Sequence, residues 1–188
     1  MSSKKELWAC DIPDAKKGSA KIETFEVSEM DSKFSAIRGD YIPAGVYKRL
    51  LVNGKLVMSD TRRERREHSE FIRMACGDVL IHGLGLACCI REVAAKSEVT
   101  SITVVEINQD VIDIVNVPGV EVICADALTF NPPKGVRYGA VWHDIWPDKC
   151  SDNLKEMHKL HRRYGRRSDW QGSWARQEIE YNLRRRGW

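Results

Sequence analysis

The feature that most constrains this chain is an alternation of short apolar runs with helical segments between residues 77 and 150. Four runs are typical of strands: 79–82, 102–105, 120–124 and 138–142. They are almost wholly apolar, as expected for strands that are covered on both faces. Helical patterns at 88–96 and 111–115 separate the first three runs. Strand–helix–strand units of this length join parallel strands by right-handed crossovers, so we expect a parallel sheet of about four strands.

Upstream of this alternation, Asn53-Gly54 lies between two runs of β-type residues, 50–52 and 56–58. Both central positions of a tight hairpin turn need a positive φ, which asparagine and glycine adopt more readily than other residues. We therefore expect a β-hairpin at this place. The Arg- and Glu-rich segment 62–75 that follows is typical of a helix with one solvent-facing side.

The chain is expected to divide into four segments. They are a mobile arm at 1–20, the β-hairpin and helix at 21–76, a Rossmann-like core at 77–150 and a basic helical C-terminal extension at 151–188. In the extension, 151–163 and 175–186 are expected to be helices and 170–174 a turn. The predicted fold class is thus α/β, with a Rossmann-like parallel sheet of about four strands, an N-terminal β-hairpin and a helical C-terminus.

The C-terminal extension carries ten Lys and Arg against five Asp and Glu, a net charge of +5, whereas residues 1–150 carry −2. Its arginines alternate with Tyr and Trp. This pattern suits nucleic acid, because the charges hold phosphates and the rings stack on bases. It would equally suit self-association through an aromatic patch, or aromatic packing in a core. Because the sheet edge beside the fourth strand would be uncovered, we also expect a homo-oligomer.

The composition indicates a cytoplasmic protein. No run of about 18 apolar residues is present, so we expect no membrane span. The first residues lack the apolar stretch of a secretory signal. The six cysteines form no CxxC pair, which is typical of reduced thiols in the cytosol.

A glycine-bearing turn follows the first strand of the alternation and leads into a helix. It is made of His82, Gly83, Leu84 and Gly85. Glycines let a ligand approach the backbone, and a helix N-terminus offers free N–H groups. Glu106 ends the second strand and Asp126 follows the third, and an acid at the second strand accepts hydrogen bonds from ribose hydroxyls. The sequence therefore predicts an adenosine-type ligand. NAD fits poorly, because Cys88 stands where its fingerprint needs Gly or Ala.

The turn and the two acids together resemble motif I and its partners in the class I S-adenosylmethionine (SAM)-dependent methyltransferases. Ala87 stands at the third glycine of that motif. The resemblance implies that SAM is the cofactor, with its ribose at Glu106 and its adenine beside Asp126. The implied cofactor-binding residues are His82, Gly83, Leu84, Gly85, Glu106, Ile107, Asp126, Ala127 and Asp144.

Within that superfamily the chain is most similar to the spermidine synthase branch, in a shortened form. The similar segments are 50–60 in the hairpin, 90–93 after the glycine turn and 104–112 around the second strand. The tyrosine of that branch's helix motif is missing, and His68 and Glu70 stand nearby. Its Asp-rich motif is reduced to Asp144 and Asp148.

Asp144 follows the fourth strand, where the resemblance places the reactive sulfonium carbon. A carboxylate there orients a nucleophile or accepts its proton, and alignment supplies much of the rate of an in-line displacement. His143 is a second catalytic candidate, as a base. His82, His143 and Asp144 also have the chemistry of metal ligands, but no metal is expected. Trp146 is expected either to wall the acceptor site or to pack against the sheet.

The expected function is that of a small SAM-dependent methyltransferase whose acceptor is a small molecule or a nucleic acid. Two alternatives stay open. The first is an aminopropyltransferase that acts on decarboxylated SAM, which an acidic amine pocket would favour. The second is a non-catalytic SAM-binding or interaction protein.

Overall fold

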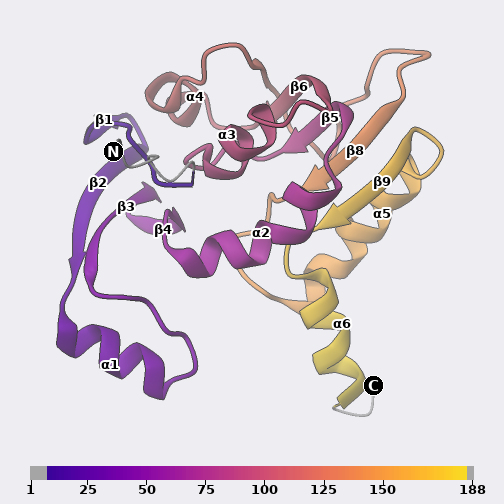
Figure 1. Ribbon diagram of the computed structural model, residues 1–188. Helices are drawn as coiled ribbons and strands as arrows, with labels where there is room; N and C mark the ends of the chain where they lie inside the picture. Colours follow the sequence, from indigo (N-terminus) through magenta and orange to yellow (C-terminus); the bar gives the residue numbers. More distant parts are fainter. Residues whose placement is uncertain (1–7, 186–188) are drawn as a thin grey trace.

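Two sheets organise residues 8–185, which are the residues that the computed structural model describes. One is antiparallel, with four strands in the order β1-β2-β3-β4, and the other is parallel, with five strands in the order β7-β6-β5-β8-β9. Figure 1 shows the antiparallel sheet beside the N-terminus and the parallel sheet, with its helices, forming the rest of the molecule.

The N-terminal sheet contains the expected hairpin. Its strands are β1 (Ala15–Lys17), β2 (Ala20–Val27), β3 (Gly45–Val52) and β4 (Lys55–Ser59). Asn53 and Gly54 form the β3–β4 turn with φ angles of 51° and 75°, as the dipeptide predicts. Helix α1 (Glu29–Ile37) joins β2 to β3, and the Ser28 hydroxyl accepts the Asp31 N–H to cap it. The hairpin prediction is confirmed.

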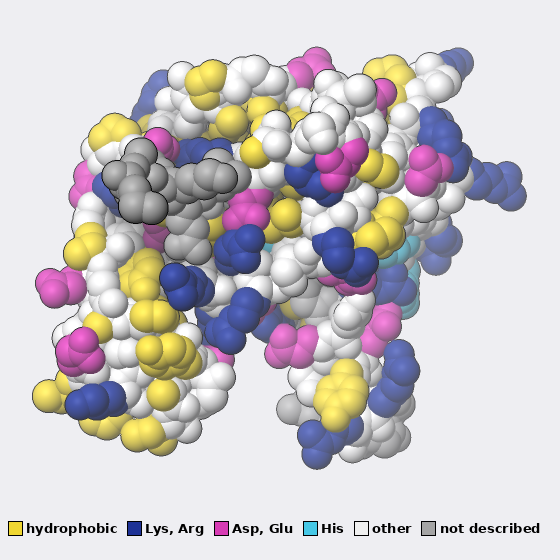
Figure 2. Space-filling model, viewed as in Figure 1, with side chains coloured by type: hydrophobic (Ala, Val, Ile, Leu, Met, Phe, Trp, Pro, Cys, Tyr) yellow, Lys and Arg dark blue, Asp and Glu magenta, His cyan; other side chains and the backbone are white. Residues whose placement is uncertain are grey.

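Helix α1 projects from the sheet with an apolar face in solvent. Met30, Phe34 and Ile37 are all exposed, and their spacing of four and three residues places them on one side of the helix. Figure 2 shows hydrophobic side chains gathered in the region of α1.

Residues 8–20, expected to belong to a mobile arm, pack against the rest of the chain. The Trp8 side chain is only 2% exposed, and its indole N–H donates to the Thr61 carbonyl oxygen. The Cys10 N–H donates to Asp60 Oδ2. The apolar area of Trp8 is buried while its polar atom keeps a partner, and this fixes the segment in place. Residues 1–7 of the predicted arm lie outside the described part of the chain.

The parallel sheet confirms the predicted fold class. Its strands are β5 (Gly77–His82), β6 (Val99–Glu106), β7 (Glu121–Cys124), β8 (Tyr138–His143) and β9 (Ser168–Ser173). Counted along the chain, their order in the sheet is 3-2-1-4-5, the order of a Rossmann-like sheet, with the switch point between β5 and β8.

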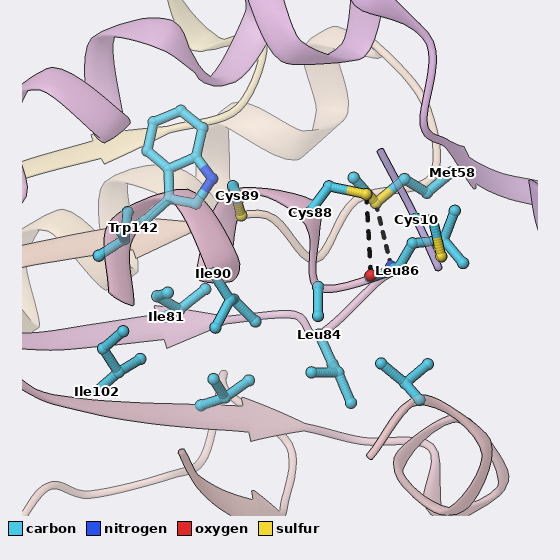
Figure 3. Close-up of a cluster of buried hydrophobic side chains, with 14 of the residues drawn as sticks. Cys10, Met58, Ile81, Leu84, Leu86, Cys88, Cys89, Ile90, Ile102 and Trp142 are labelled. Atoms are coloured by element: carbon cyan, nitrogen blue, oxygen red, sulfur yellow. Dashed lines mark hydrogen bonds between the residues drawn. The ribbon is translucent and has the colours of Figure 1, made fainter. Parts of the chain in front are cut away.

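Helices cover the sheet on both faces. They are α2 (Arg62–Met74), α3 (Cys88–Ala94), α4 (Gln109–Val115), α5 (Leu154–Tyr164) and α6 (Arg176–Arg185), with a short 3-10 helix, η1 (Ser151–Asn153). Alternate strand residues point to opposite faces. Thus Ile81 and Trp142 join the cluster under α2 and α3, shown in Figure 3, whereas Leu80 and Val141 join the cluster under α5.

Strand β9 is the one element of the sheet that the sequence analysis missed. The prediction of a turn at 170–174 is wrong: residues 168–173 pair in parallel with β8, from Tyr138 opposite Ser168 to His143 opposite Ser173. The segment Ser-Asp-Trp-Gln-Gly-Ser contains one large apolar residue, so it lacks the pattern of a buried strand. Because β9 covers the edge of β8, the argument that led us to expect a homo-oligomer is lost, and the oligomer stays a prediction.

No helix within residues 8–185 combines the length and the apolar character that crossing a membrane would need.

Candidate functional site

A cavity of about 510 Å³ lies at the carboxyl ends of the parallel strands. The turn after β5, the ends of β6 and β7, and the segment after β8 form one wall. The β3–β4 hairpin and helix α2 form the other, with Leu50, Val52, Val57, Met58, Glu64 and His68. The cavity therefore lies outside the switch point of the sheet, where ligands bind in folds of this class.

The hairpin's part in the cavity was not predicted. The apolar runs 50–52 and 56–58 predict that the hairpin is partly buried, but they do not show what it packs against. Leu50 and Val52 are two residues apart and lie on one face of β3. Both line the cavity, and Leu50 also belongs to the core, so a single face of the strand contacts both.

The glycine turn approaches the segment after β8 very closely. Gly83 has a φ of +99°, and a β-carbon on it would lie 2.1 Å from the Asp144 carbonyl oxygen. A β-carbon on Gly85, with φ of +53°, would lie 2.5 Å from the Met58 sulfur. Gly83 therefore requires glycine because its contact is with backbone, whereas at position 85 the Met58 side chain would have to move. Ala87 adopts a φ of 58° at the start of α3, so this alanine stands in a glycine-like conformation.

Glu106 holds the turn from the end of β6. Its Oε2 accepts the Leu84 N–H at 2.9 Å and its Oε1 accepts the Asn108 N–H at 2.8 Å. Each carboxylate oxygen has two lone pairs, so each keeps one for a ligand. The neighbouring Ile107 side chain is 68% exposed and lies on the cavity wall.

Asp126 lies farther along the same wall, after β7. Its Oδ1 accepts the Leu128 N–H at 2.8 Å, which fixes the direction of the carboxylate. Ala127 beside it is buried. The structure thus brings eight of the predicted residues to one cavity: Gly83, Leu84, Gly85, Glu106, Ile107, Asp126, Ala127 and Asp144.

Asp144, which is partly exposed, pairs with the buried His68 of α2. The His68 Nδ1 donates to the Glu64 carbonyl oxygen, and its Nε2 lies 2.8 Å from Asp144 Oδ2. Both ring nitrogens face oxygen atoms, an arrangement that favours the doubly protonated imidazole. Burial is the largest single effect and disfavours the charged ring, but the hydrogen bond and charge of Asp144, together with the Glu64 carbonyl and carboxylate, outweigh it and raise the pKa of His68.

The pairing of His68 with Asp144 could not be predicted. The two residues are 76 positions apart, and only the packing of α2 over the end of β8 brings them together.

His82 and His143 do not line the cavity. Both side chains are completely buried on the α5 face of the sheet, where their Nδ1 atoms lie 2.8 Å apart. They are the last residues of β5 and β8. The residue before each of them points to the opposite face of the sheet, which is the face toward the cavity. His82 is therefore no ligand of a bound cofactor through its side chain, and His143 is not a base that touches substrate. Both of these predictions are corrected by the structure.

The two histidines belong to a directed chain of hydrogen bonds. Gln171 donates its amide N–H to the His161 carbonyl oxygen, so its Oε1 faces His143 Nε2, which donates. His143 Nδ1 then accepts from His82 Nδ1–H, and His82 Nε2 accepts from the Tyr164 hydroxyl. Every buried polar atom of both rings has a partner only while the rings are neutral. Burial accordingly lowers the pKa of His82 to about 3 and that of His143 well below its ordinary value.

Acid is expected to destabilise the fold through this neutral pair. Unfolded histidines take up protons below pH 6.5, whereas folded His82 does so only near 3, so the unfolded state binds more protons in this window. Between pH 7 and 5 we expect the free energy of unfolding to fall by roughly 2 kcal/mol for each of the two histidines. Urea unfolding at both pH values measures this.

The acid effect has an internal control. His158 is exposed, so His158→Gln is expected to keep the same difference between the two pH values. His68, whose pKa is raised, acts in the opposite direction: the folded state takes up this proton before the unfolded state does, so His68 adds stability as the pH falls through 6.5 and partly offsets the loss. An unfolding free energy that is flat from pH 7 to 5 would contradict the neutral pair.

Residues 8–185 hold no group of three or more His, Cys, Asp and Glu arranged to bind a metal ion.

One arginine of the basic C-terminal extension forms hydrogen bonds within the fold. The Arg163 guanidinium donates to the carbonyl oxygens of Ala127, Leu128 and Phe130, which ties α5 to the loop after β7. Tyr164 is wholly buried. Tyr181, by contrast, is exposed, with Arg185 over its ring. Nucleic-acid binding by the exposed part of the extension stays a prediction.

Comparisons with known proteins find similarity in structure alone. No protein-family model matches the chain, and no curated protein matches it. One similar solved structure is an S-adenosylmethionine-dependent methyltransferase from Clostridium acetobutylicum ATCC 824, with a TM-score of 0.39 and 9% identity over 56% of this chain. Another is the spermidine synthase from Thermotoga maritima, with a TM-score of 0.41 and 16% identity over 69% of this chain.

The chain spans less than half the length of either protein, 43% of the first and 45% of the second. Likeness at this level assigns neither an activity nor the role of any residue.

Proposed function

We propose that this chain binds SAM and transfers its methyl group to an acceptor at Asp144. The observation that carries the proposal is the Glu106 carboxylate at the end of β6. Two backbone N–H groups hold it in place, and it keeps one lone pair on each oxygen beside the cavity. A carboxylate held in this way is suited to accept both hydroxyls of a ribose.

The lining of the cavity fits the rest of an adenosyl ligand. Asp126 keeps Oδ2 free to accept an adenine amino group, and the exposed Ile107 offers an apolar surface to a base ring. The volume of about 510 Å³ lies within the range of small-molecule sites. The lining holds five carboxylates and no Lys or Arg, which suits a ligand with a sulfonium charge.

The paired Asp144 supplies the chemistry at the acceptor end. When bound, SAM supplies a methyl group activated by the sulfonium. The His68 ring fixes the Asp144 carboxylate through Oδ2, which leaves Oδ1 to orient an acceptor and to accept its proton. The hairpin and α2 border this side of the cavity.

A second candidate is aminopropyl transfer from decarboxylated SAM. The absence of Lys and Arg from the lining favours it, because the amino-acid carboxylate of SAM would find no such partner there and His68 is already paired with Asp144. Decarboxylated SAM has no such carboxylate, and its amine would meet the acidic lining.

Calorimetric titration with SAM, decarboxylated SAM and S-adenosylhomocysteine tests both candidates. We expect SAM and S-adenosylhomocysteine to bind. A preference for decarboxylated SAM of tenfold or more would favour aminopropyl transfer instead. Binding of none of the three would overturn both.

Asp144→Asn is expected to abolish turnover while leaving the affinity for S-adenosylhomocysteine within about threefold. The amide oxygen still accepts from His68, so the loop keeps its shape, but the proton acceptor is lost. Loss of a positioned base typically lowers kcat by 10²–10⁴-fold. The measurement is S-adenosylhomocysteine release from SAM across a panel of acceptors.

Asp148→Asn is the matched control, because Asp148 is an exposed carboxylate of the same loop and is not among the residues lining the cavity. It is expected to keep full turnover. Equal losses in both variants would point to the charge of the loop rather than to Asp144. A wild-type chain that binds SAM and turns over no acceptor would be a non-catalytic binder.

A further inference from the structure

The solvent face of α5 carries a line of positive charges. The side chains that form it are all exposed: Lys155, Lys159, Arg162 and Arg166. Steps of four, three and four residues place them on one side of a helix, with the β-carbons of neighbouring members about 5–6 Å apart. Gly165, at the end of α5, keeps a helical φ of −58° and ψ of −28°, so Arg166 continues the line. Together the four residues form a basic stripe along the helix.

The opposite side of α5 belongs to the core. Met157, Leu160 and Tyr164 are wholly buried there, in the cluster on the α5 face of the parallel sheet. An amphipathic helix that buries its apolar side in this way turns its polar side to solvent. The basic stripe therefore lies on the outer surface of the molecule.

The basic stripe has no acidic partner within residues 8–185. None of its four side chains forms an ion pair with the described part of the chain. The two acids nearest in sequence are placed elsewhere. Glu156 accepts the Trp146 N–H and lines the cavity, and Asp152 lies in η1, before the helix begins. The positive charges of the stripe are thus left for a partner outside the chain.

Helix stability does not account for the basic stripe. Lys155 lies in the first turn of α5, where the helix dipole disfavours a cation. Along the stripe, every neighbouring pair brings two like charges together at a spacing of three or four residues, and such pairs repel. The arrangement costs stability in the free protein, and a bound polyanion would relieve the repulsion.

The surroundings of the basic stripe distinguish between kinds of polyanion. None of the exposed large apolar side chains in the described part of the chain lies on α5. An amphipathic helix needs such side chains to enter a membrane surface, and so does the core of a stable protein–protein interface. Phosphate contacts need only charges and N–H donors, and a guanidinium group matches the geometry of phosphate. The stripe therefore fits a nucleic-acid backbone best.

The buried ring of α5 favours a duplex over a single strand. Proteins that hold single strands combine charges with aromatic rings on which the bases stack. Tyr164, the one Phe, Tyr or Trp of α5, is wholly buried and offers no ring to a base. Contacts with the backbone of a duplex need no ring, because its bases stay paired and stacked on each other.

We propose that the basic stripe of α5 binds the phosphate backbone of double-stranded nucleic acid without reading its sequence. The inference goes beyond the proposed function, because it needs neither the cavity nor SAM. From Lys155 to Arg166 the stripe is about 16 Å long at the rise of an α-helix. Phosphates of one duplex strand follow each other about every 3.4 Å along the axis, so the stripe is long enough to contact several of them.

Fluorescence anisotropy with a labelled DNA duplex of about 20 base pairs tests the inference over a series of salt concentrations. Each neutralised phosphate releases about 0.9 counterion, so four charges predict that log K falls with log salt at a slope of roughly −3 to −4. We expect the affinity to fall about 100-fold between about 50 and 200 mM salt. A slope near zero, or no binding at about 50 mM salt, would overturn the inference.

The double variant Lys159→Gln with Arg162→Gln removes two charges from the centre of the basic stripe. We expect it to reduce the steepness of the slope by about 2 and to weaken binding at about 50 mM salt at least about tenfold. Glutamine is a good helix former, so the fold is expected to persist, which urea unfolding checks. The salt series on the wild-type chain stands even where this variant fails to fold.

Arg66→Gln with Arg73→Gln is the matched control. It removes the same net charge from exposed residues of α2, which packs on the opposite face of the sheet. It is expected to bind the duplex as the wild type does. Equal weakening in the two double variants would mean that net charge alone attracts the duplex, and the basic stripe would then have no special part.

Further probes separate a duplex from other polyanions. A single strand of the same sequence is expected to bind at least about threefold more weakly, because its phosphates release only about 0.7 counterion each. Polyglutamate, and vesicles of phosphatidylserine with phosphatidylcholine, are expected to leave the duplex bound at about 150 mM salt. Tighter binding of the single strand, or displacement of the duplex by polyglutamate or by vesicles, would overturn the assignment to a duplex.

Discussion

Glu106→Ala is expected to weaken the binding of SAM and of S-adenosylhomocysteine at least about 100-fold. A hydrogen bond to a charged group contributes roughly 1.5–3 kcal/mol, and the carboxylate offers one lone pair to each of two ribose hydroxyls. Loss of both corresponds to about 3 kcal/mol or more, which is a factor of over 100 in Kd. Calorimetric titration of both ligands measures the change.

Two further variants separate ligand contact from local loosening, because Glu106 also accepts the Leu84 and Asn108 N–H groups. Glu106→Gln keeps one acceptor oxygen, so its affinity is expected to lie between those of the wild type and Glu106→Ala. Glu121→Ala removes an exposed carboxylate of β7 that accepts the Thr103 hydroxyl and does not line the cavity, and it is expected to bind normally. A folded Glu106→Ala protein with unchanged affinity would remove the basis of the proposed function.

Gly83→Ala is expected to destabilise the fold by about 4 kcal/mol or more, a loss that single substitutions rarely reach. Alanine is strained at a φ of +99°, and its β-carbon would lie 2.1 Å from the Asp144 carbonyl oxygen. The clash is with backbone, so relief requires β5 and β8 to move apart at their ends. Urea unfolding measures the free energy, and a low yield of folded protein would be the extreme form of the same result.

Gly119→Ala is the matched control for the clash. Gly119 also has a positive φ, of +76°, but a β-carbon on it would meet nothing within 4 Å. It is expected to lose only the cost of the left-handed conformation, about 1 kcal/mol. Equal losses at the two glycines would show that the close approach to Asp144 contributes nothing.

The elements that could be predicted are those whose structure is indicated by the pattern of neighbouring residues in the sequence. The apolar runs of β5, β6 and β8, and the Asn53-Gly54 turn, carry their structure in neighbouring residues. Strand β9 does not, because Ser168, Gly172 and Ser173 are small or polar and pair with β8 only once that strand is in place. Burial of Trp8 likewise depends on contacts with a helix more than 50 residues away.

By itself, the sequence determined that Gly83, Glu106, Asp126 and Asp144 meet at one edge, because the carboxyl ends of parallel strands lie together whatever covers them. Only the tertiary structure decided which side chains face the cavity. It turned His82 and His143 to the α5 face, and it placed His68 against Asp144. The reason is that strand ends are set by chain connectivity, whereas partners across a cavity are set by the packing of segments that are distant in sequence.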